Sequence, residues 1–324
     1  MRAGTRAQPD DRADAGAHAP SRVEVGAHAS PRADAAPDEE QYAGRSLWVD
    51  AWRTLRKNRA AVVSGVIIGI MAVLVVVGPW FSPYSYDFTD WSNLSIGPSV
   101  ETGHLFGTDT LGRDLFVRTL YGGRISLMVG LSATLVSLLI GISYGAIAGY
   151  FGGRLDNLMM RVVDILYAMP FMFFVILLMV FFGRNLFLIF VALGAIIWLD
   201  MARIVRGQTL SLKHREFVEA AKAQGVGTFA VIRRHIVPNL LGVVAVYVTL
   251  TIPQVILMES FLSFLGLGVQ EPMTSWGALV KDGSDEMQSS PWLLLFPAVF
   301  LAMTLFCFNF LGDGMRDALD PKDR

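Results

Sequence analysis

Residues 60–81 read AAVVSGVIIGIMAVLVVVGPWF, and this stretch decides the class of fold. It contains no charged residue. An α-helix rises about 1.5 Å per residue, so about 20 apolar residues cross the ~30 Å hydrocarbon core of a bilayer. Residues 60–81 are therefore predicted to form a membrane span.

Further apolar stretches follow along the chain. The composition agrees with repeated spans, because 53% of residues are hydrophobic, 17% are charged and the mean hydropathy is +0.47. Soluble domains carry about 25% charged residues. We predict an all-α, polytopic membrane protein with six transmembrane helices, which places both termini on one side. The other five predicted spans cover residues 125–150, 162–182, 186–201, 239–258 and 291–311.

The distribution of Lys and Arg sets the orientation. Segments that face the cytoplasm carry more of these residues than segments outside. With the N-terminus inside, 22 of the 27 Lys and Arg residues are internal. We therefore expect both termini to be cytoplasmic. The five external ones are Arg113, Arg118, Arg124, Arg184 and Lys281.

Residues 1–43 differ in kind from the rest of the chain. They are rich in Ala, Arg, Asp and Pro and are predicted to form a disordered cytoplasmic tail. No apolar core precedes Ala60, so no signal peptide is expected. Residues 44–59 form a cytoplasmic segment before the transmembrane domain, residues 60–324. The net charge of −1 indicates no nucleic-acid partner.

The spans themselves exclude several function classes. Ionisable residues inside a membrane usually mark ion or proton pathways, but Asp164, Arg184, Asp200 and Glu259 all fall at ends of predicted spans. This argues against a proton- or sodium-coupled carrier. The chain has no His-Glu-x-x-His or Gly-x-Ser-x-Gly motif and no Gly-Lys dipeptide. Hydrolase sites and a phosphate loop are thus unsupported, and any ATP must bind another polypeptide.

One large cytoplasmic loop covers residues 203–238. Strong helix formers fill its first part, and Gly225 is suited to end that helix in a left-handed conformation. Thr228 is predicted to cap a second helix over residues 229–236 before Pro238. The physics alone permits two interpretations: a docking element for a partner, or an amphipathic loop whose Arg203 and Arg206 reach lipid headgroups. The predicted apolar face of the first helix is Phe217, Ala220, Ala221 and Gln224.

The sequence of this loop favours docking. Glu219-Ala220-Ala221, Gly225 and Val237-Pro238 resemble the Glu-Ala-Ala loop of ABC-importer transmembrane subunits. In that family the loop holds a coupling helix, which sits in a groove of the ATPase subunit. The resemblance implies that Glu219, Ala220, Ala221 and Gly225 dock onto an ATPase. His235 departs from the usual aliphatic residue, with Ile236 and Val237 keeping the apolar character.

Other segments resemble the second ("C") permease subunit of peptide importers, and some resemble its oligopeptide branch. The resemblance covers residues 45–324 and implies a type I ABC-importer fold in the cytoplasmic (inner) membrane. It also implies a second permease subunit, two ATP-binding subunits that hold ATP and Mg²⁺, and an extracytoplasmic peptide-binding protein. This chain would then carry no cofactor, metal or catalytic residue. Dipeptides, glutathione-like peptides or nickel chelates are alternative substrates, and a stand-alone carrier is the rival class. The segments are FGTDTLGRD (106–114), ESFLSFLGLG (259–268), SWG (275–277), GDGMRDALDP (312–321), RSLW (45–48), WLDMAR (198–203) and GQTLSL (207–212).

Two outer segments are candidates for gating or receptor contact. Asp109, Arg113 and Asp114 lie in a glycine-containing loop, where they either fold the loop or contact peptide. Gly266 and Gly268 indicate a sharp bend at the outer membrane edge. That bend is interpreted as a gate or receptor surface, or as a helix end with close backbone packing.

Overall fold

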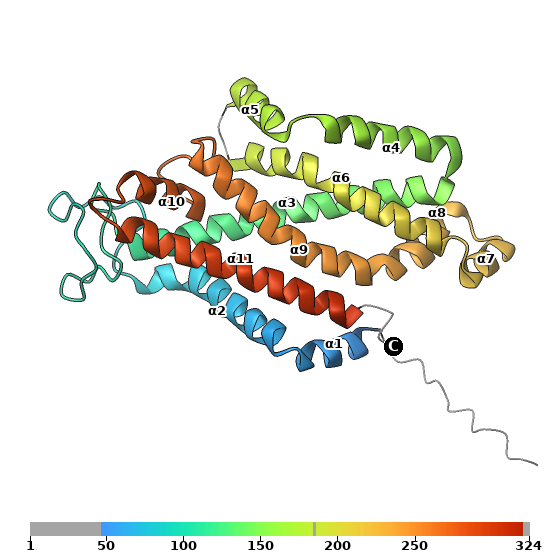
Figure 1. Cartoon of the computed structure of the whole chain (residues 1–324), viewed down its shortest axis with the longest axis horizontal. Coiled ribbons are helices and arrows are strands. Elements are labelled where there is room, and N and C mark those ends of the chain that lie inside the picture. Colours follow the sequence, from blue (N-terminus) through green and yellow to red (C-terminus); the bar gives the residue numbers. More distant parts are fainter. Residues whose placement is uncertain (1–46, 184–185, 320–324) are drawn as a thin grey trace, which may run out of the picture. The chain divides into compact units, whose positions relative to one another are not determined.

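The computed structural model describes residues 47–183 and 186–319, and the predicted tail over residues 1–43 lies outside this range. Helices account for nearly all regular structure in the described part, which has no β-strand. The elements in chain order are α1 Leu47–Lys57, α2 Arg59–Phe81, α3 Leu115–Phe151, α4 Gly153–Ala168, α5 Phe171–Phe182, α6 Leu186–Leu212, α7 Glu216–Ala223, α8 Thr228–Val231, the π-helix η1 Ile232–Ile236, α9 Val237–Phe264, α10 Trp276–Asp285 and α11 Trp292–Leu319 (Figure 1).

Five helical stretches in the described residues are long and apolar enough to cross a membrane, or six if a bent pair counts as one span. The bent pair corresponds to the predicted span over residues 162–182. It consists of α4 and α5, which meet at 82°. Pro170 explains the break, because a proline disfavours helical backbone in the preceding residue. Met169 is accordingly extended, with φ −74° and ψ 131°.

Two helices run well beyond the spans predicted for them. α6 continues to Leu212, and α9 continues to Phe264. Asp200 and Glu259, which were predicted to lie at the ends of spans, therefore lie within longer helices. Hydropathy placed the span boundaries at the first charged residue, but a helix does not stop where its apolar run stops.

Glycines bring α3 and α6 into close contact. Gly141, Gly145 and Gly149 recur every four residues on one face of α3. A Cβ at Gly141 would lie 2.5 Å from Cβ of Met201, and one at Gly149 would lie 2.8 Å from the carbonyl oxygen of Arg206. Small residues at such spacing let membrane helices pack backbone to backbone.

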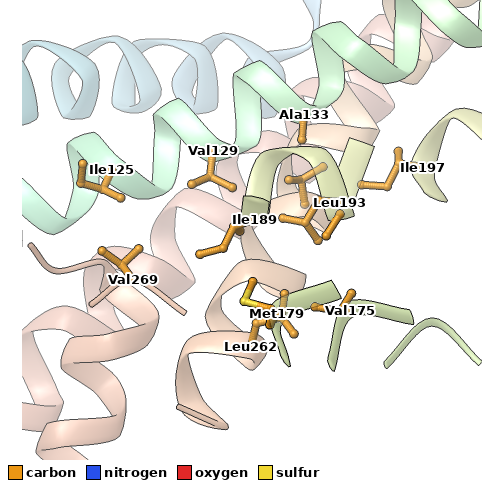
Figure 2. Packing of buried hydrophobic residues seen from close by; sticks show 12 residues of the cluster. Ile125, Val129, Ala133, Val175, Met179, Ile189, Leu193, Ile197, Leu262 and Val269 are labelled. Carbon is orange, nitrogen blue, oxygen red and sulfur yellow. The ribbon is translucent and has the colours of Figure 1, made fainter. Parts of the chain in front are cut away.

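The largest apolar cluster joins four helices near the end of the bundle that is predicted to face outward, which we call the outer end. Ile125 and Val129 of α3 face Ile189 and Leu193 of α6, as Figure 2 shows. The short helix α5 contributes Val175 and Met179, and α9 contributes Leu262 (Figure 2). This cluster anchors the second half of the broken span.

The two candidate regions lie at opposite ends of the bundle. The loop over residues 82–114 and α10 form one end, while α7 and α8 form the other (Figure 1). Any communication between them must therefore run along the spans.

Candidate functional site

Helix α7 contains the Glu-Ala-Ala sequence and ends as predicted. Gly225 has φ +76°, its N–H donates to the carbonyl of Lys222 (2.9 Å), and the N–H of Val226 donates to that of Ala221 (3.1 Å). This left-handed ending suits glycine, which has no Cβ to clash. Nothing lies within 4 Å of the position of an added Cβ. The fold thus requires glycine here for its backbone conformation and not for lack of space.

The second helix of the loop differs from the prediction. Thr228 is the first residue of α8 and not its cap, because Gly227 occupies the capping position without a side-chain hydrogen bond. α8 then continues through the π-helix η1 into α9. Pro238 has no N–H to donate, and the wide π turn just before it accommodates this loss. One continuous helical rod, residues 228–264, therefore connects the loop to the outer end of the bundle.

One face of α7 packs on its own chain and the other is exposed. Val218 is fully buried in a cluster with Ile236 and Leu240. Ala221, predicted to dock, is also buried at 6% exposure. Since its side chain is covered by the same chain, it is not available to a partner here. Exposed on the other face are Glu219, Ala220 and Gly225, with Phe217 at 41% and Phe229 at 73% exposure; we call these five residues the loop-tip surface.

Lysines hold α7 against the end of α3. Nζ of Lys213 donates to the carbonyl of Gly149 (3.0 Å). Nζ of Lys222 donates to the carbonyl of Lys213 (3.3 Å) and lies 5.2 Å from the ring centroid of Tyr150. The position of α7 is therefore fixed to the α3–α6 pair.

Arginines of α6 bind α4. Arg206 makes a bidentate pair with Asp156, with N–O distances of 2.5 and 2.7 Å. Arg203 pairs with Asp164 at 2.7 Å. Both side chains thus have protein partners, which differs from the lipid-headgroup interpretation. The pairs join the first half of the broken span to the helix that leads into the loop.

At the opposite end, Asp109 organises the outer loop. Its Oδ1 accepts the backbone N–H groups of Leu111 and Arg113, both at 2.9 Å. Its Oδ2 accepts Nε of Arg113 at 2.6 Å, and Nη1 of Arg113 reaches Glu271 at 3.0 Å. Burial lowers the pKa of Arg113, but the Asp109 and Glu271 carboxylates outweigh it, and the pKa lies above its ordinary value. Arg113 stays charged and ties the outer loop to the segment after α9.

Asp114 starts α3. Its Oδ1 accepts the N–H of Val117 at 2.8 Å, a helix cap, and its Oδ2 lies 2.8 Å from Nδ1 of the buried His104. Asp109, Arg113 and Asp114 are thus positioned to fold the loop. His104 and Glu271 were not among the predicted site residues. His104 lies two residues before the motif that contains Asp109 (residues 106–114), and this proximity was the available signal. No local pattern indicates Glu271.

The two outer glycines form the bend after α9. Gly266 has φ +74°, and the N–H of Leu267 donates to the carbonyl of Leu262 at 2.9 Å. Gly268 packs directly against Ser263, where a Cβ would clash. The bend returns the chain to Ser275, whose side chain caps α10. Close packing is therefore observed at Gly268 alone, whereas Gly266 has open space around it and is suited by its left-handed backbone. A gating role stays a prediction.

The helical bundle, the broken span and the helical loop at one end together form a fold of the type I ABC-importer permease kind. The fold is similar to a chain of the MetNI methionine ABC transporter in an inward-facing conformation. The TM-score is 0.53 at 17% identity, and the match covers 64% of this chain and 96% of that one. At this identity the likeness concerns the fold alone.

The chain belongs to the binding-protein-dependent transport system inner membrane component family, whose family model matches residues 141–324. A second model, the N-terminal transmembrane domain of oligopeptide transport permease C, matches residues 46–98. The chain is 61% identical to the oligopeptide transport system permease protein OppC of Haemophilus influenzae, over 89% of this chain and 92% of the relative. It is 62% identical to OppC of Escherichia coli K12, over 87% of this chain and 93% of the relative. It is 50% identical to the dipeptide transport system permease protein DppC of Bacillus subtilis, over 85% of this chain and 86% of the relative.

The protein is therefore a multi-pass protein of the inner membrane and a permease of the peptide ABC-importer type. The resemblance inferred from the sequence motifs is confirmed. The orientation of the termini and the roles of the candidate residues remain predictions.

Proposed function

We propose that this chain is the C-type permease subunit of an ATP-driven oligopeptide importer. The observation that carries the proposal is the exposed loop-tip surface on α7 and α8, at the base of a rod that runs to the outer end of the bundle. Two exposed phenylalanines at a loop tip are costly in water, and exposed apolar patches mark contact sites. A partner that covers Phe217 and Phe229 removes this cost.

In this proposal the chain pairs with a second permease subunit, two ATPase subunits and an extracytoplasmic peptide-binding protein. ATP and Mg²⁺ bind to the ATPase subunits, and no residue of this chain performs bond chemistry. Closure of the ATPases moves α7. Because Val218 packs on Ile236 and Leu240 in one cluster, movement of α7 is passed to the rod formed by α8, η1 and α9. The spans then change between inward-facing and outward-facing states.

Oligopeptides are the proposed substrates, supported by 61–62% identity to OppC proteins. Dipeptides are the next alternative, because the sequence identity to DppC of Bacillus subtilis is 50%. Glutathione is less supported, since the identity to the glutathione transport system permease protein GsiD of Pectobacterium atrosepticum is 36%. A nickel chelate is the remaining alternative within the family.

Uptake measurements in a strain that lacks this chain test the proposed substrate. Labelled di-, tri- and longer peptides are supplied, with and without the chain restored. We expect restoration to recover uptake of tripeptides and longer peptides. Recovery of dipeptide or glutathione uptake alone would contradict the oligopeptide assignment, and recovery of none would contradict peptide transport altogether.

A cysteine at Ala220 is expected to crosslink to an ATPase subunit in the assembled transporter. Ala220 is exposed on α7, whereas its neighbour Ala221 is buried. The single native cysteine, Cys307, is replaced by serine to give a clean background. Ala221→Cys is the matched control and should crosslink much less. A stand-alone carrier would give no ATPase adduct from either position, which mass spectrometry of the crosslinked band would reveal.

A further inference from the structure

The proposed function leaves open which residues meet the peptide, and a charged region beside the break between α4 and α5 addresses this. The exposed face here combines Asp200 and Arg203 of α6 with Asp164 and Tyr167 of α4. All belong to membrane-spanning helices. Asp200 lies 14 residues after Leu186, or about 21 Å along α6, far from its outer end. By contrast, α2 carries no charge between residues 60 and 81.

A charge on a span is costly against lipid, so such residues usually face a bundle interior or a water-filled path. The side chains of Asp164 and Arg203 are 66% and 39% exposed in this chain. An exposed face with these groups does not suit contact with acyl chains. It suits a water-filled path between this chain and a second permease subunit.

Asp200 is the group on this face without a matching charge in contact. Arg203 is neutralised by Asp164 at 2.7 Å, and its guanidinium lies 4.4 Å from the ring centroid of Tyr167. Among the described residues, the side chain of Asp200 makes neither a hydrogen bond nor an ion pair. The group of Asp164, Arg203 and Asp200 therefore carries a net charge of −1, which is complementary to a monovalent cation.

A pocket of about 290 Å³ adjoins Asp200. Its other walls are mainly apolar and include Met169 at the break, Phe174 of α5, Ile196 of α6 and Met258 of α9, with Tyr167 on one side. Complete ligand sites have volumes of about 300–1,000 Å³. The volume of this pocket is thus at the lower end of that range. The pocket fits one end of a larger molecule and offers it a charged contact and an apolar wall.

We infer that Asp200 and the adjoining pocket bind the amino-terminal residue of a transported peptide, with the ammonium group on Asp200 and the first side chain against the apolar walls. A carboxylate forms a stronger hydrogen bond with an ammonium group than a neutral acceptor does, and the nearby aromatic ring of Tyr167 adds a favourable surface for a cation. The broken span fits this assignment, because substrate sites in transporters are commonly built at interrupted helices. The inference rests on the proposed function, since it requires that peptides pass this face.

The role of the Asp200 carboxylate can be tested in the complete transporter after reconstitution. We expect Asp200→Asn to lower uptake of a tripeptide with a free amino terminus about tenfold, the effect of losing one charge-assisted hydrogen bond. ATP hydrolysis by the same preparation is measured in parallel and shows whether the variant complex is assembled. Asp313→Asn, which removes an exposed carboxylate from α11, is the matched control and should transport normally.

The outcomes separate this inference from the proposed function. If the wild-type complex shows neither uptake nor stimulated hydrolysis, the proposed function fails. If the wild type transports and Asp200→Asn transports equally well, the inference alone is overturned. If Asp200→Asn does not assemble, a second measurement that retains Asp200 decides the question.

That second measurement uses Ile196→Cys in the Cys307→Ser background. A water-soluble thiol reagent should modify this cysteine in nanodiscs, but not the exposed Val73→Cys on α2. A peptide with a free amino terminus should slow the modification, and its N-acetylated form should not. Absence of modification would place the face against lipid or protein and overturn the inference. Equal protection by both peptides, or protection by an N-acetylated peptide that contains lysine, would overturn the assignment to the amino terminus.

Discussion

Replacing Gly225 with aspartate (Gly225→Asp) is expected to abolish peptide uptake while the chain stays in the membrane. The backbone at Gly225 has φ +76°, which costs a residue with a side chain about 1–2 kcal/mol. That cost is too small to unfold a bundle whose core is formed by five long helices. Within the chain, nothing lies within 4 Å of the new Cβ. The aspartate therefore projects into the space that the ATPase subunit is proposed to occupy.

The expected signature is uncoupling. The ATPase subunits should still hydrolyse ATP, but the peptide-loaded binding protein should no longer stimulate them, and labelled peptide should not accumulate. Uptake and ATP hydrolysis are both measured on the reconstituted transporter, with the amount of chain in the membrane determined by blotting.

Two variants separate strain from blocked docking. Gly225→Ala keeps the strained backbone but adds only a methyl group, so it should retain much of the uptake. Gly227→Asp adds the same side chain where φ is −62°, at the capping position of α8, which aspartate favours. It should transport better than Gly225→Asp. Normal uptake by Gly225→Asp would refute the coupling role of the loop.

The sequence predicted the first helix of the loop and its end well because the signals are local. Gly225 ends α7 through a backbone conformation that one residue type adopts freely, and the helix formers before it act through short-range propensity. The face of α7 was predicted less well. Ala220 and Ala221 are indistinguishable in the sequence, but one is exposed and the other is buried against the chain. Which alanine faces a partner depends on where α3, α6 and α9 lie, and no local pattern encodes that.

The boundaries of the spans were also predicted only in part, because local patterns do not encode how the helices pack. Hydropathy located every apolar stretch, but it placed Asp200 at the end of a span when α6 continues to Leu212. It also predicted one span over residues 162–182, where the chain bends by 82°. Pro170 was a visible signal for that break. The pairs of Arg203 with Asp164 and of Arg206 with Asp156 were not visible, because their partners are 39 and 50 residues apart.

A second hidden feature is the buried network around Glu259. This carboxylate is fully buried and accepts hydrogen bonds from Ser126 of α3 (3.2 Å) and Ser263 of α9 (2.7 Å). Ser126 also accepts the N–H of Trp276, the first residue of α10, at 3.2 Å. Ser263 contacts the capping Ser275 at 3.2 Å. No lysine or arginine in the described part of the chain pairs with Glu259, so hydroxyl groups alone satisfy it.

Glu259→Ala is therefore expected to destabilise the outer junction of α3, α9 and α10. The change leaves a cavity and removes the acceptor for two buried hydroxyl groups, which together should lower the free energy of unfolding by about 3 kcal/mol. Thermal unfolding of the detergent-solubilised transporter measures the effect. Glu259→Gln keeps the volume, and its amide can accept from one serine and donate to the hydroxyl oxygen of the other, so it should cost about 1 kcal/mol or less. If alanine destabilises the protein no more than glutamine does, the serine network does not hold α10 in place. If both variants unfold like the wild type but Glu259→Ala alone loses uptake, Glu259 acts in transport and not in holding the junction together.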